Sequence, residues 1–332
     1  MMHSRSLRWI TSLAAGVLLL PGCADTDADT TLPPATTASD TTATTTAPTT
    51  TQVPSTTSTS VMVTPTLPPA LDAKYAVVLT EGVTGPDTMD IAVWAPEADG
   101  LRPIAIVYHG YGSQGIHYAD MASLIASQGV VVFAPDYRST LIPTSDWRSA
   151  YRDAECAYRH IRTIASDYGG SVDVPITVIG HSIGAAVGMS LVLDEYTYSP
   201  EGPFDGCPGD VPRPDNLVAM SGCHYRNQFG LTFPFTPAEF GWGHLDANIR
   251  LVVGSDDQVC KPWQSQDAEM QLIADGYSSV DLAVIDDTDH FSVIFTGYEN
   301  GPWHGPDVEW IALPNDPGGV AAVEIILDTI SD

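Results

Sequence analysis

The chain has 332 residues, of which 44% are apolar, and its 13 Lys and Arg stand against 41 Asp and Glu, for a formal net charge of −28. A nucleic-acid-binding surface needs a basic patch, and the sequence has only two lysines, Lys74 and Lys261, so nucleic acid is excluded as a partner. The length suffices for one large domain or two ordinary ones, with a core that buries about 75% of the unfolded surface.

The N-terminal residues have the pattern of an export signal. Arg5 and Arg8 precede an apolar stretch over residues 9–20, which is shorter than the roughly 20 apolar residues of a membrane-spanning helix. The stretch runs into the letters LPGC, ending at Cys23, which resemble the lipobox of bacterial lipoproteins. The resemblance implies a signal peptide over residues 1–23, a lipid on Cys23, and an exported protein held at a membrane or cell surface. An ordinary secretory signal with an incidental cysteine is the alternative.

Residues 24–66 have an unusual composition. Of the 42 residues from 25 to 66, 18 are threonine, and the remainder is rich in Pro, Ala and Ser. Such a segment has little apolar surface to bury, so burial cannot offset the entropy that ordering would cost. We expect a disordered stalk, which leaves residues 67–332 as one globular domain.

This domain alternates short β-branched runs with helical patterns. Eight strands are expected near residues 75–79, 89–95, 103–108, 130–134, 175–180, 217–221, 249–253 and 280–285. Helices are expected near residues 117–128, 147–167, 183–195, 263–275 and 318–331. The alternation, with continuous apolar strands, predicts an α/β fold whose mostly parallel sheet is covered by helices on both faces. Because no helix separates the first two strands, one edge of the sheet should be antiparallel.

One expected strand runs directly into a turn that contains a serine. The strand near 175–180 continues into the letters GHSIG (180–184), and a helix begins at once. Strand, turn and helix together are the setting of the G-x-S-x-G nucleophile elbow. A strained turn with a side chain at its apex leaves no room for neighbouring Cβ atoms, which explains the glycines. Ser182 is therefore the expected nucleophile, at the positive end of a helix.

Several motifs together resemble the α/β-hydrolase superfamily over nearly all of residues 70–332. The letters HGYG (109–112) are similar to the oxyanion loop of lipases and esterases. PDYR (135–138) is similar to a segment of hormone-sensitive-lipase-like and feruloyl-esterase-like enzymes, and ITVIGHSIGA (176–185) resembles the carboxylesterase pattern. Position 111 is Tyr where hormone-sensitive lipases have Gly, so the loop is closer to that of HGX-type lipases. The resemblance implies the α/β-hydrolase fold with a small cap or none.

The resemblance also selects the partners of Ser182, since in this superfamily the acid and then the histidine follow the serine along the chain. GSDDQV (254–259) resembles the family's G-x-x-D turn, which makes Asp257 the acid and Asp256 the alternative. DHF (289–291) resembles the family's histidine loop, which makes His290 the base. His304 is the other histidine after the acid.

The oxyanion hole of this superfamily is built from backbone N–H groups. Its donors should be the amides of Ile183 and of one residue in the 109–112 loop. Similarity to HGX-type lipases selects Tyr111, with Gly110 and Gly112 as alternatives. We expect neither a metal nor a cofactor, because the sequence has no His-Glu-x-x-His motif and no paired Cys/His cluster.

Four cysteines remain besides Cys23. In an exported chain Cys156, Cys207, Cys223 and Cys260 predict two disulfides, for which three pairings are possible. Cys223 and Cys260 both follow strands that are expected to be neighbours, at the same edge of the sheet. We therefore favour Cys223–Cys260, which would brace the loop that carries Asp257, and Cys156–Cys207.

The expected chemistry is hydrolysis of carboxylic esters by a Ser-His-Asp mechanism. In the aromatic stretch 222–248, Phe229, Phe233 and Trp242 are candidates for an apolar wall that binds an acyl or aryl group, and core packing is their alternative role. With little cap, the site should take short or accessible acyl esters, either small molecules or ester groups on a polymer. A serine peptidase, an acyltransferase and a non-catalytic surface binding module are the alternatives.

Overall fold

The structure of the chain is a computed structural model. It describes residues 73–80, 89–97, 99–141, 147–193, 212–224, 227–228, 231–232, 244–298 and 310–331. All of these lie within residues 56–332, which form one compact unit. The expected signal peptide and stalk, and the pocket candidates Phe229, Phe233 and Trp242, lie outside the described residues.

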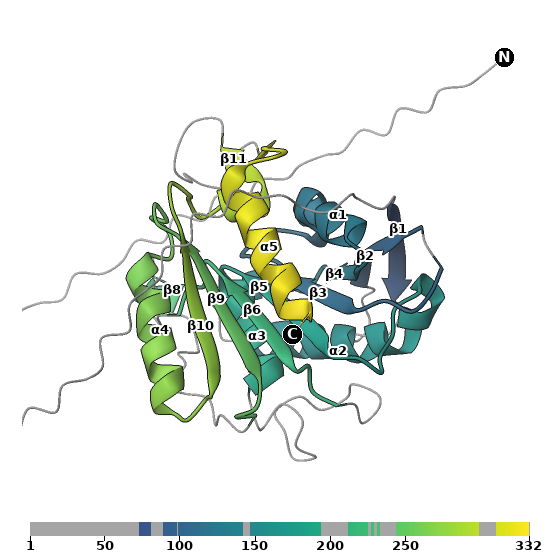
Figure 1. Ribbon diagram of the computed structural model, residues 1–332, viewed down its shortest axis with the longest axis horizontal. Helices are drawn as coiled ribbons and strands as arrows, with labels where there is room; N and C mark the ends of the chain where they lie inside the picture. Colours follow the sequence, from purple (N-terminus) through teal and green to yellow (C-terminus); the bar gives the residue numbers. More distant parts are fainter. Residues whose placement is uncertain are drawn as a thin grey trace, which may run out of the picture. The chain divides into compact units, whose positions relative to one another are not determined.

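An eight-stranded sheet forms the centre of this unit, with the strand order β1-β2-β4-β3-β5-β6-β9-β10 (Figure 1). The strands are β1 Ala73–Thr80, β2 Met89–Pro96, β3 Ile104–Tyr108, β4 Val131–Pro135, β5 Ile176–His181, β6 Asn216–Met220, β9 Asn248–Gly254 and β10 Ser279–Ile285. β2 pairs antiparallel with both β1 and β4, and all other neighbours are parallel. The mostly parallel sheet and its antiparallel edge are therefore confirmed.

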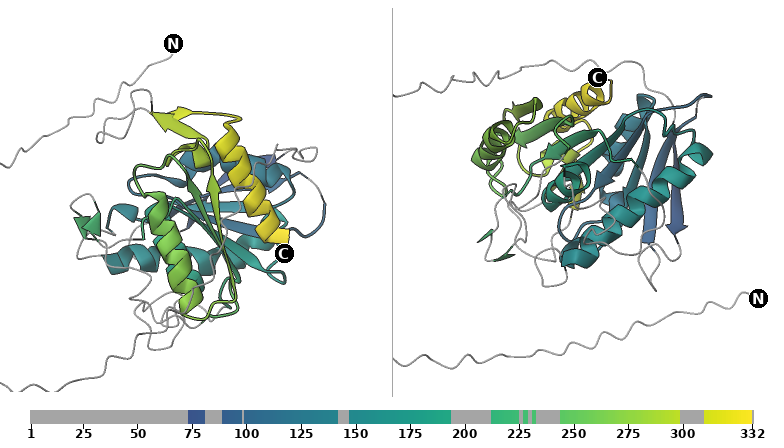
Figure 2. Two further views of the ribbon diagram at one scale, coloured as in Figure 1. Left: turned by 60° about the vertical axis from the view of Figure 1, so that its left-hand side comes forward. Right: turned by 90° about the horizontal axis from the view of Figure 1, so that it is seen from below.

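Among the described residues, five α-helices lie on the two faces of the sheet (Figures 1 and 2). They are α1 Ala119–Ser127, α2 Trp147–Ile164, α3 Ile183–Leu193, α4 Pro262–Ala274 and α5 Pro317–Ser331. Apolar residues of α1 and α5 pack in one core cluster, and those of α2, α3 and α4 pack in another. The two clusters lie on opposite faces of the sheet.

Strand β3 illustrates why the central strands are apolar throughout. Ile104 and Ile106 belong to the cluster under α2 and α3, whereas Ala105 and Val107 belong to the cluster under α1 and α5. Successive side chains of a strand point to opposite faces, so a strand covered on both sides needs apolar residues at every position. All five residues of β3 are fully buried.

Two short antiparallel pairs add to the expected elements. β7 Asn227–Gln228 pairs with β8 Leu231–Thr232, and β11 Thr296–Tyr298 pairs with β12 Trp310–Ala312. Strands of two or three residues are too short to produce a recognisable alternation of apolar and polar residues, so the sequence patterns gave no signal for them.

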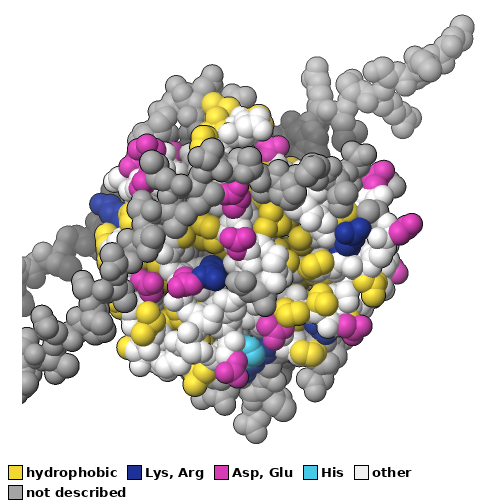
Figure 3. All heavy atoms as spheres, in the orientation of Figure 1, with side chains coloured by type: hydrophobic (Ala, Val, Ile, Leu, Met, Phe, Trp, Pro, Cys, Tyr) yellow, Lys and Arg dark blue, Asp and Glu magenta, His cyan; other side chains and the backbone are white. Residues whose placement is uncertain are grey.

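The surface of the described part is mixed. Figure 3 shows acidic side chains scattered over the visible face, among apolar patches and few basic groups. Within the described residues, no helix has the length and hydropathy that a bilayer-crossing segment requires.

Five neighbouring strands run parallel, so their carboxyl ends lie together at the same end of the sheet. These strands are β3, β5, β6, β9 and β10. In open α/β sheets, functional groups gather at this carboxyl-terminal end of the strands. The loops that follow these five strands carry all the candidate catalytic residues.

Candidate active site

Ser182 lies in the sharp turn between β5 and α3. Its φ of +58° is in the left-handed region, which a residue with a side chain seldom adopts. A Cβ atom on Gly184 would lie 2.1 Å from the carbonyl oxygen of Tyr108, and one on Gly180 would lie 2.2 Å from the carbonyl oxygen of Gly184. Neither distance is possible, so both glycines are needed for the turn that presents Ser182.

Asp257 is fully buried just after β9, and both of its carboxylate oxygens accept hydrogen bonds. Oδ1 accepts the backbone N–H groups of Val259 and Cys260, each at 2.8 Å, and Oδ2 lies 2.8 Å from Nδ1 of His290. Asp256, the alternative acid, is exposed. The structure therefore brings Asp257, and not Asp256, to the histidine.

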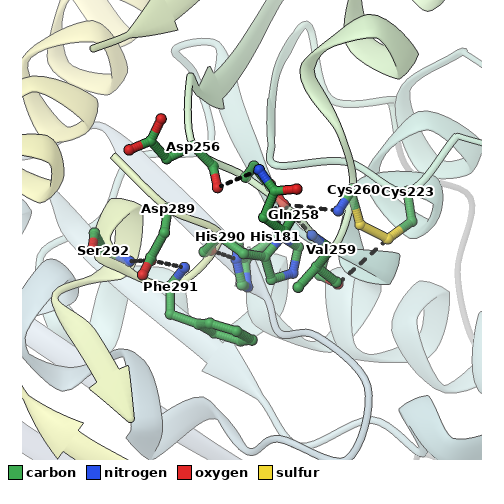
Figure 4. A network of polar contacts seen from close by, with 12 residues as sticks. His181, Cys223, Asp256, Gln258, Val259, Cys260, Asp289, His290, Phe291 and Ser292 are labelled. Carbon is green, nitrogen blue, oxygen red and sulfur yellow. Dashed lines mark hydrogen bonds and ion pairs between the residues drawn. A yellow bond between two sulfur atoms is a disulfide. The ribbon is translucent and has the colours of Figure 1, made fainter. Parts of the chain in front are cut away.

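His290 follows β10 and is only 2% exposed. Its Nδ1 must donate to the Asp257 carboxylate, which can only accept, so in the neutral ring Nε2 carries the lone pair. The side chain of Asp289 accepts the N–H groups of Phe291 and Ser292, each at 2.8 Å, and so shapes the turn around the histidine (Figure 4). A ring whose free nitrogen is basic is suited to accept a proton from a nucleophile.

Hydrogen bonds join the turn of the acid to the loop of the histidine. The N–H of Asp256 donates to the carbonyl of Thr288 at 2.9 Å, and the N–H of Asp287 donates to Oγ of Ser255 at 3.0 Å. The two segments approach so closely that a Cβ on Gly254 would lie 2.0 Å from the carbonyl oxygen of Thr288. Acid and base are thus held by their backbones as well as by their side chains.

The HGYG loop lies against Ser182, since a Cβ on Gly110 would come within 3.2 Å of the Ser182 Cβ. The N–H of Gly110 donates to the hydroxyl of Tyr118 at 2.8 Å. The N–H of Gly112 donates to Oγ of Ser139 at 3.1 Å. Both alternative oxyanion donors are therefore occupied by side-chain acceptors.

Two amides beside Ser182 make no hydrogen bond within the described structure. One belongs to Tyr111, and the other to Ile183, the first residue of α3, where a helix has no internal acceptor for its N–H groups. These are the two donors expected from the sequence. Unpaired amides next to a serine can stabilise negative charge on an oxygen that develops there.

The direction of the Tyr111 N–H is fixed through the carbonyl of the same peptide unit. The Gly110 carbonyl accepts from Nδ1–H of His109 at 2.9 Å and from the N–H of Ser113 at 3.3 Å. In a trans peptide the N–H points away from the C=O, so anchoring the Gly110 carbonyl sets the Tyr111 N–H. Burial lowers the pKa of His109 to about 4, which keeps its ring neutral.

The PDYR segment after β4 supports the same loop. The Tyr137 hydroxyl donates to the His109 carbonyl at 2.6 Å, and its ring lies 4.5 Å from the His109 ring, centre to centre. The Arg138 guanidinium forms two hydrogen bonds with the buried carboxylate of Asp153, at 2.6 and 2.9 Å. This motif, which the sequence analysis used only as a resemblance, thus has a structural role beside the site.

Ser182 and His290 are not hydrogen-bonded to each other in this structure. Oγ of Ser182 instead lies 3.9 Å from Sγ of Cys223. A serine side chain rotates among three staggered rotamers, and the nucleophile–base contact of such sites often forms only when substrate binds. The structure therefore shows the pair Asp257–His290 assembled and the Ser182 hydroxyl turned toward the disulfide.

Cys223 and Cys260 form a disulfide, as the sequence analysis favoured (Figure 4). The bridge joins the segment after β6 to the segment after β9, and these strands are neighbours in the sheet. Cys156 is also disulfide-bonded, and its expected partner Cys207 lies outside the described residues. In the part of the chain that the structure describes, no group of three or more His, Cys, Asp or Glu residues could hold a metal ion.

No family model matches the chain. Its structure is similar to the esterase 2 of Thermogutta terrifontis, with a TM-score of 0.54 and 13% identity over 77% of this chain and 90% of that one. It is also similar to carboxyl esterase 2 of Tuber melanosporum, with a TM-score of 0.53 and 16% identity over 77% of this chain and 86% of that one. The fold is the α/β-hydrolase fold.

Two curated proteins match a shorter stretch of the sequence. They are the monoglyceride lipase of Mus musculus, 29% identical over 111 residues, and a monoglyceride lipase homolog of Monkeypox virus, 31% identical over 99 residues. The matches cover 32% and 28% of this chain, and they span about a third of either relative's length, 34% in each case.

Sequence reasoning missed the side chains that hold the loops of the site. Tyr118, Tyr137 and Ser139 each bond to the backbone of the 109–112 loop. Tyr118 belongs to no motif, so no local signal could have found it, whereas Tyr137 and Ser139 lie in and directly after the PDYR segment, which was read only as a resemblance. His304 lies outside the described residues.

Proposed function

We propose that this protein is a serine hydrolase of carboxylic esters. The observation that carries the proposal is the pair of unpaired amides, Tyr111 and Ile183, that flank Ser182 in an α/β-hydrolase fold. The hydrogen-bonded pair of Asp257 and His290 on the neighbouring loops supports it. Structurally similar proteins named esterases and sequence relatives named monoglyceride lipases point to the same bond type.

In this mechanism the Ser182 hydroxyl turns toward His290 and attacks the ester carbonyl while Nε2 takes its proton. The amides of Tyr111 and Ile183 donate to the oxyanion, and each such donor contributes about 2.7–4 kcal/mol to lowering the barrier. His290 then gives the proton to the departing alcohol, and Asp257 holds and stabilises the imidazolium without taking the proton itself. Water, activated by His290, releases the acid from Ser182.

The proposed substrates are short or accessible acyl esters. The side chain of Tyr111, at the oxyanion loop, is 42% exposed, and Ile116 nearby in the chain is 41% exposed. Apolar side chains that remain open to solvent at the oxyanion loop and just after it favour an acyl group that lies against the surface. The relatives named monoglyceride lipases are consistent with a single-chain glyceride as one member of this class.

Hydrolysis of p-nitrophenyl esters from acetate to decanoate tests the proposal. We expect the wild-type protein to hydrolyse the short members and the Ser182→Ala variant to lose at least about a thousand-fold in kcat. Ser190→Ala, which changes a buried serine two turns further along α3, should keep its activity. A fluorophosphonate probe should label the wild type and Ser190→Ala but not Ser182→Ala.

The outcomes separate the alternatives. Cleavage of amide substrates without cleavage of esters would favour a peptidase. A folded wild-type protein that neither hydrolyses an ester nor reacts with the fluorophosphonate would overturn the proposal and favour a binding protein.

We also propose that the protein is exported and held at a membrane through a lipid on Cys23. The support is the LPGC sequence after a short apolar segment, together with the disulfides of the domain, which persist in oxidising compartments. Expressed in a bacterial host, the wild type should sediment with membranes, and Cys23→Ala should not. Equal distribution of the two proteins would contradict the anchor.

A further inference from the structure

Tyr118 is a buried residue that contacts two loops of the site at once. It is the last residue of the short helix η1, Gly115–Tyr118, and is 1% exposed. Its hydroxyl accepts the N–H of Gly110 at 2.8 Å and lies 2.8 Å from Nδ1 of His181. Gly110 belongs to the oxyanion loop, and His181 precedes the nucleophile directly in the chain.

His181 continues this connection to the loop of the catalytic histidine. Its ring is 2% exposed, and Nε2 lies 2.8 Å from the backbone carbonyl of His290. The rings of His181 and His290 lie 4.8 Å apart, centre to centre, and Figure 4 shows them side by side. The connection therefore reaches from the loop after β3 to the loop after β10.

In a neutral His181 ring, the two hydrogen bonds of its nitrogens can each run in only one direction. A carbonyl can only accept, so Nε2 of His181 carries the hydrogen and Nδ1 carries the lone pair. The Tyr118 hydroxyl then donates to Nδ1, which leaves a lone pair on its oxygen to accept the Gly110 N–H. Burial lowers the pKa of His181 well below its usual value, in agreement with a neutral ring.

We propose that Tyr118 and His181 are positioning residues, which hold the oxyanion loop and the His290 loop in place around Ser182. The inference rests on the proposed function and extends it to two residues that touch no reacting atom. Displacement of either loop by about 1 Å could lower the catalytic rate by up to about a hundred-fold, because the reacting groups must be aligned closely. A purely structural pair would instead lower stability and leave kcat unchanged.

Tyr108 provides the matched control. It is likewise fully buried, but its hydroxyl donates to the carbonyl of Ala154 at 2.8 Å, and its ring belongs to the core cluster on the opposite face of the sheet. Tyr118→Phe and Tyr108→Phe each remove one buried hydroxyl without changing the ring. Both variants should lose thermal stability, and Tyr118→Phe should lose more, because its hydroxyl bonds to both Gly110 and His181, whereas that of Tyr108 donates to the Ala154 carbonyl.

The kinetic test compares these variants on the best p-nitrophenyl ester. Tyr118→Phe should lower kcat and the rate of fluorophosphonate labelling by about ten-fold or more, with KM within about two-fold of wild type. Tyr108→Phe should stay within about two-fold in all three. Equal losses of kcat in the two variants would overturn the proposal.

His181→Asn tests the second half of the connection. The shorter amide can accept from Tyr118 in place of Nδ1, but it does not reach the His290 carbonyl. We expect a loss of kcat, and we expect the double variant with Tyr118→Phe to fall no further than the worse single variant, because both act through one connected unit. Losses of kcat that multiply would contradict a single unit.

A measurement without substrate keeps this inference separate from the proposed function. Nitrogen-15 NMR of the histidine rings should show His181 in wild type as neutral with the hydrogen on Nε2, both at pH 7 and at pH 6. A charged ring at pH 7, or a hydrogen on Nδ1, would overturn the connection. If wild type hydrolyses no ester, the proposed function fails, and the NMR result still decides the hydrogen-bonded connection.

Discussion

The carboxylate of Asp257 accepts hydrogen bonds on both oxygens, and only one of these bonds comes from the histidine. The other two come from backbone amides of its own turn, which fix the side chain before any substrate arrives. The exposed Asp256 beside it has the same chemistry without that environment. At the scale of the residue, burial and partners therefore decide which of two adjacent aspartates can orient His290.

Asp257→Asn should abolish most of the activity and preserve the fold. The amide oxygen can still accept the two backbone N–H groups, but the amide nitrogen facing Nδ1 of His290 is a donor, so the ring must place its hydrogen on Nε2 and can no longer act as base. We expect kcat to fall by about 10³–10⁴, measured on the best ester substrate.

Asp256→Asn is the control for that variant, because it makes the same chemical change at the exposed neighbour. It should remain within about two-fold of wild type. A comparable loss in both variants would show that the turn itself, and not the Asp257 carboxylate, is what the histidine needs.

At the scale of the element, the Cys223–Cys260 disulfide joins the segments after β6 and β9, which contact Ser182 and Asp257. The N–H of Cys223 donates to the carbonyl of Ser182 at 3.4 Å, and the N–H of Cys260 donates to the Asp257 carboxylate at 2.8 Å. Each cysteine of the bridge is therefore joined by one hydrogen bond to a site residue, Cys223 to Ser182 and Cys260 to Asp257. Both cysteines are buried, at 4% and 0% exposure, which protects the bridge from reductants in solution.

Removing this bridge should affect stability and activity together. Its cysteines are 37 residues apart in sequence, for which the chain-entropy model gives about 4 kcal/mol of stabilisation. We expect the variant with both Cys223→Ala and Cys260→Ala to lose about 2–4 kcal/mol in the free energy of unfolding, measured in urea.

The activity of that double variant should be measured at a temperature where it is fully folded by circular dichroism. We expect kcat to be lower than in wild type, because the Ser182 and Asp257 turns are no longer tied to each other. A stability loss with unchanged kcat would show that the bridge serves only the fold.

The elements themselves could largely be predicted from the sequence. The eight main strands and five main helices lie where periodicity placed them, since runs such as Ile104–Val107 are apolar at every position and are bounded by turns. The two short strand pairs were missed, because β7, β8, β11 and β12 have only two or three residues each. The pairing of Cys223 with Cys260 could be inferred, because both follow adjacent parallel strands.

At the scale of the whole molecule, several histidines are buried without a charged partner among the described residues. Burial lowers the pKa of His109 and of His224 to about 4, and lowers that of His181 well below its usual value. In the unfolded chain a histidine titrates near pH 6.5. Between about pH 6.5 and pH 4 the unfolded chain therefore binds more protons at these sites than the folded chain.

The free energy of unfolding should consequently fall as the pH is lowered through this range. Each such histidine contributes a slope of up to about 1.4 kcal/mol per pH unit. His224 is suited to a test because, among the described residues, its buried Nε2 has no hydrogen-bond partner. In urea unfolding from pH 8 to pH 5, the free energy of unfolding should fall less steeply with decreasing pH in His224→Asn than in wild type.

The measurement at pH 8 separates two effects of that substitution. His224 is neutral there in both the folded and the unfolded chain, so a difference at pH 8 reports packing. A further change below pH 6.5 reports proton binding by His224 in the unfolded chain. Parallel curves for the two proteins across the whole range would contradict the assignment of His224 as a buried neutral ring.

The sequence by itself determined the strands, the helices, the sharp turn at Ser182 and the expected order of acid and base. These depend on local features: periodicity, the glycines of a strained turn, and short motifs at strand ends. Only the tertiary structure decided that Asp257 rather than Asp256 meets His290 and that Tyr111 rather than Gly110 or Gly112 has a free amide. It also brought Tyr118, 63 residues from His181 in the chain, within hydrogen-bond distance of it. Such contacts depend on which loops the parallel strands bring together at their carboxyl ends. No local pattern of residues encodes this order of the strands in the sheet.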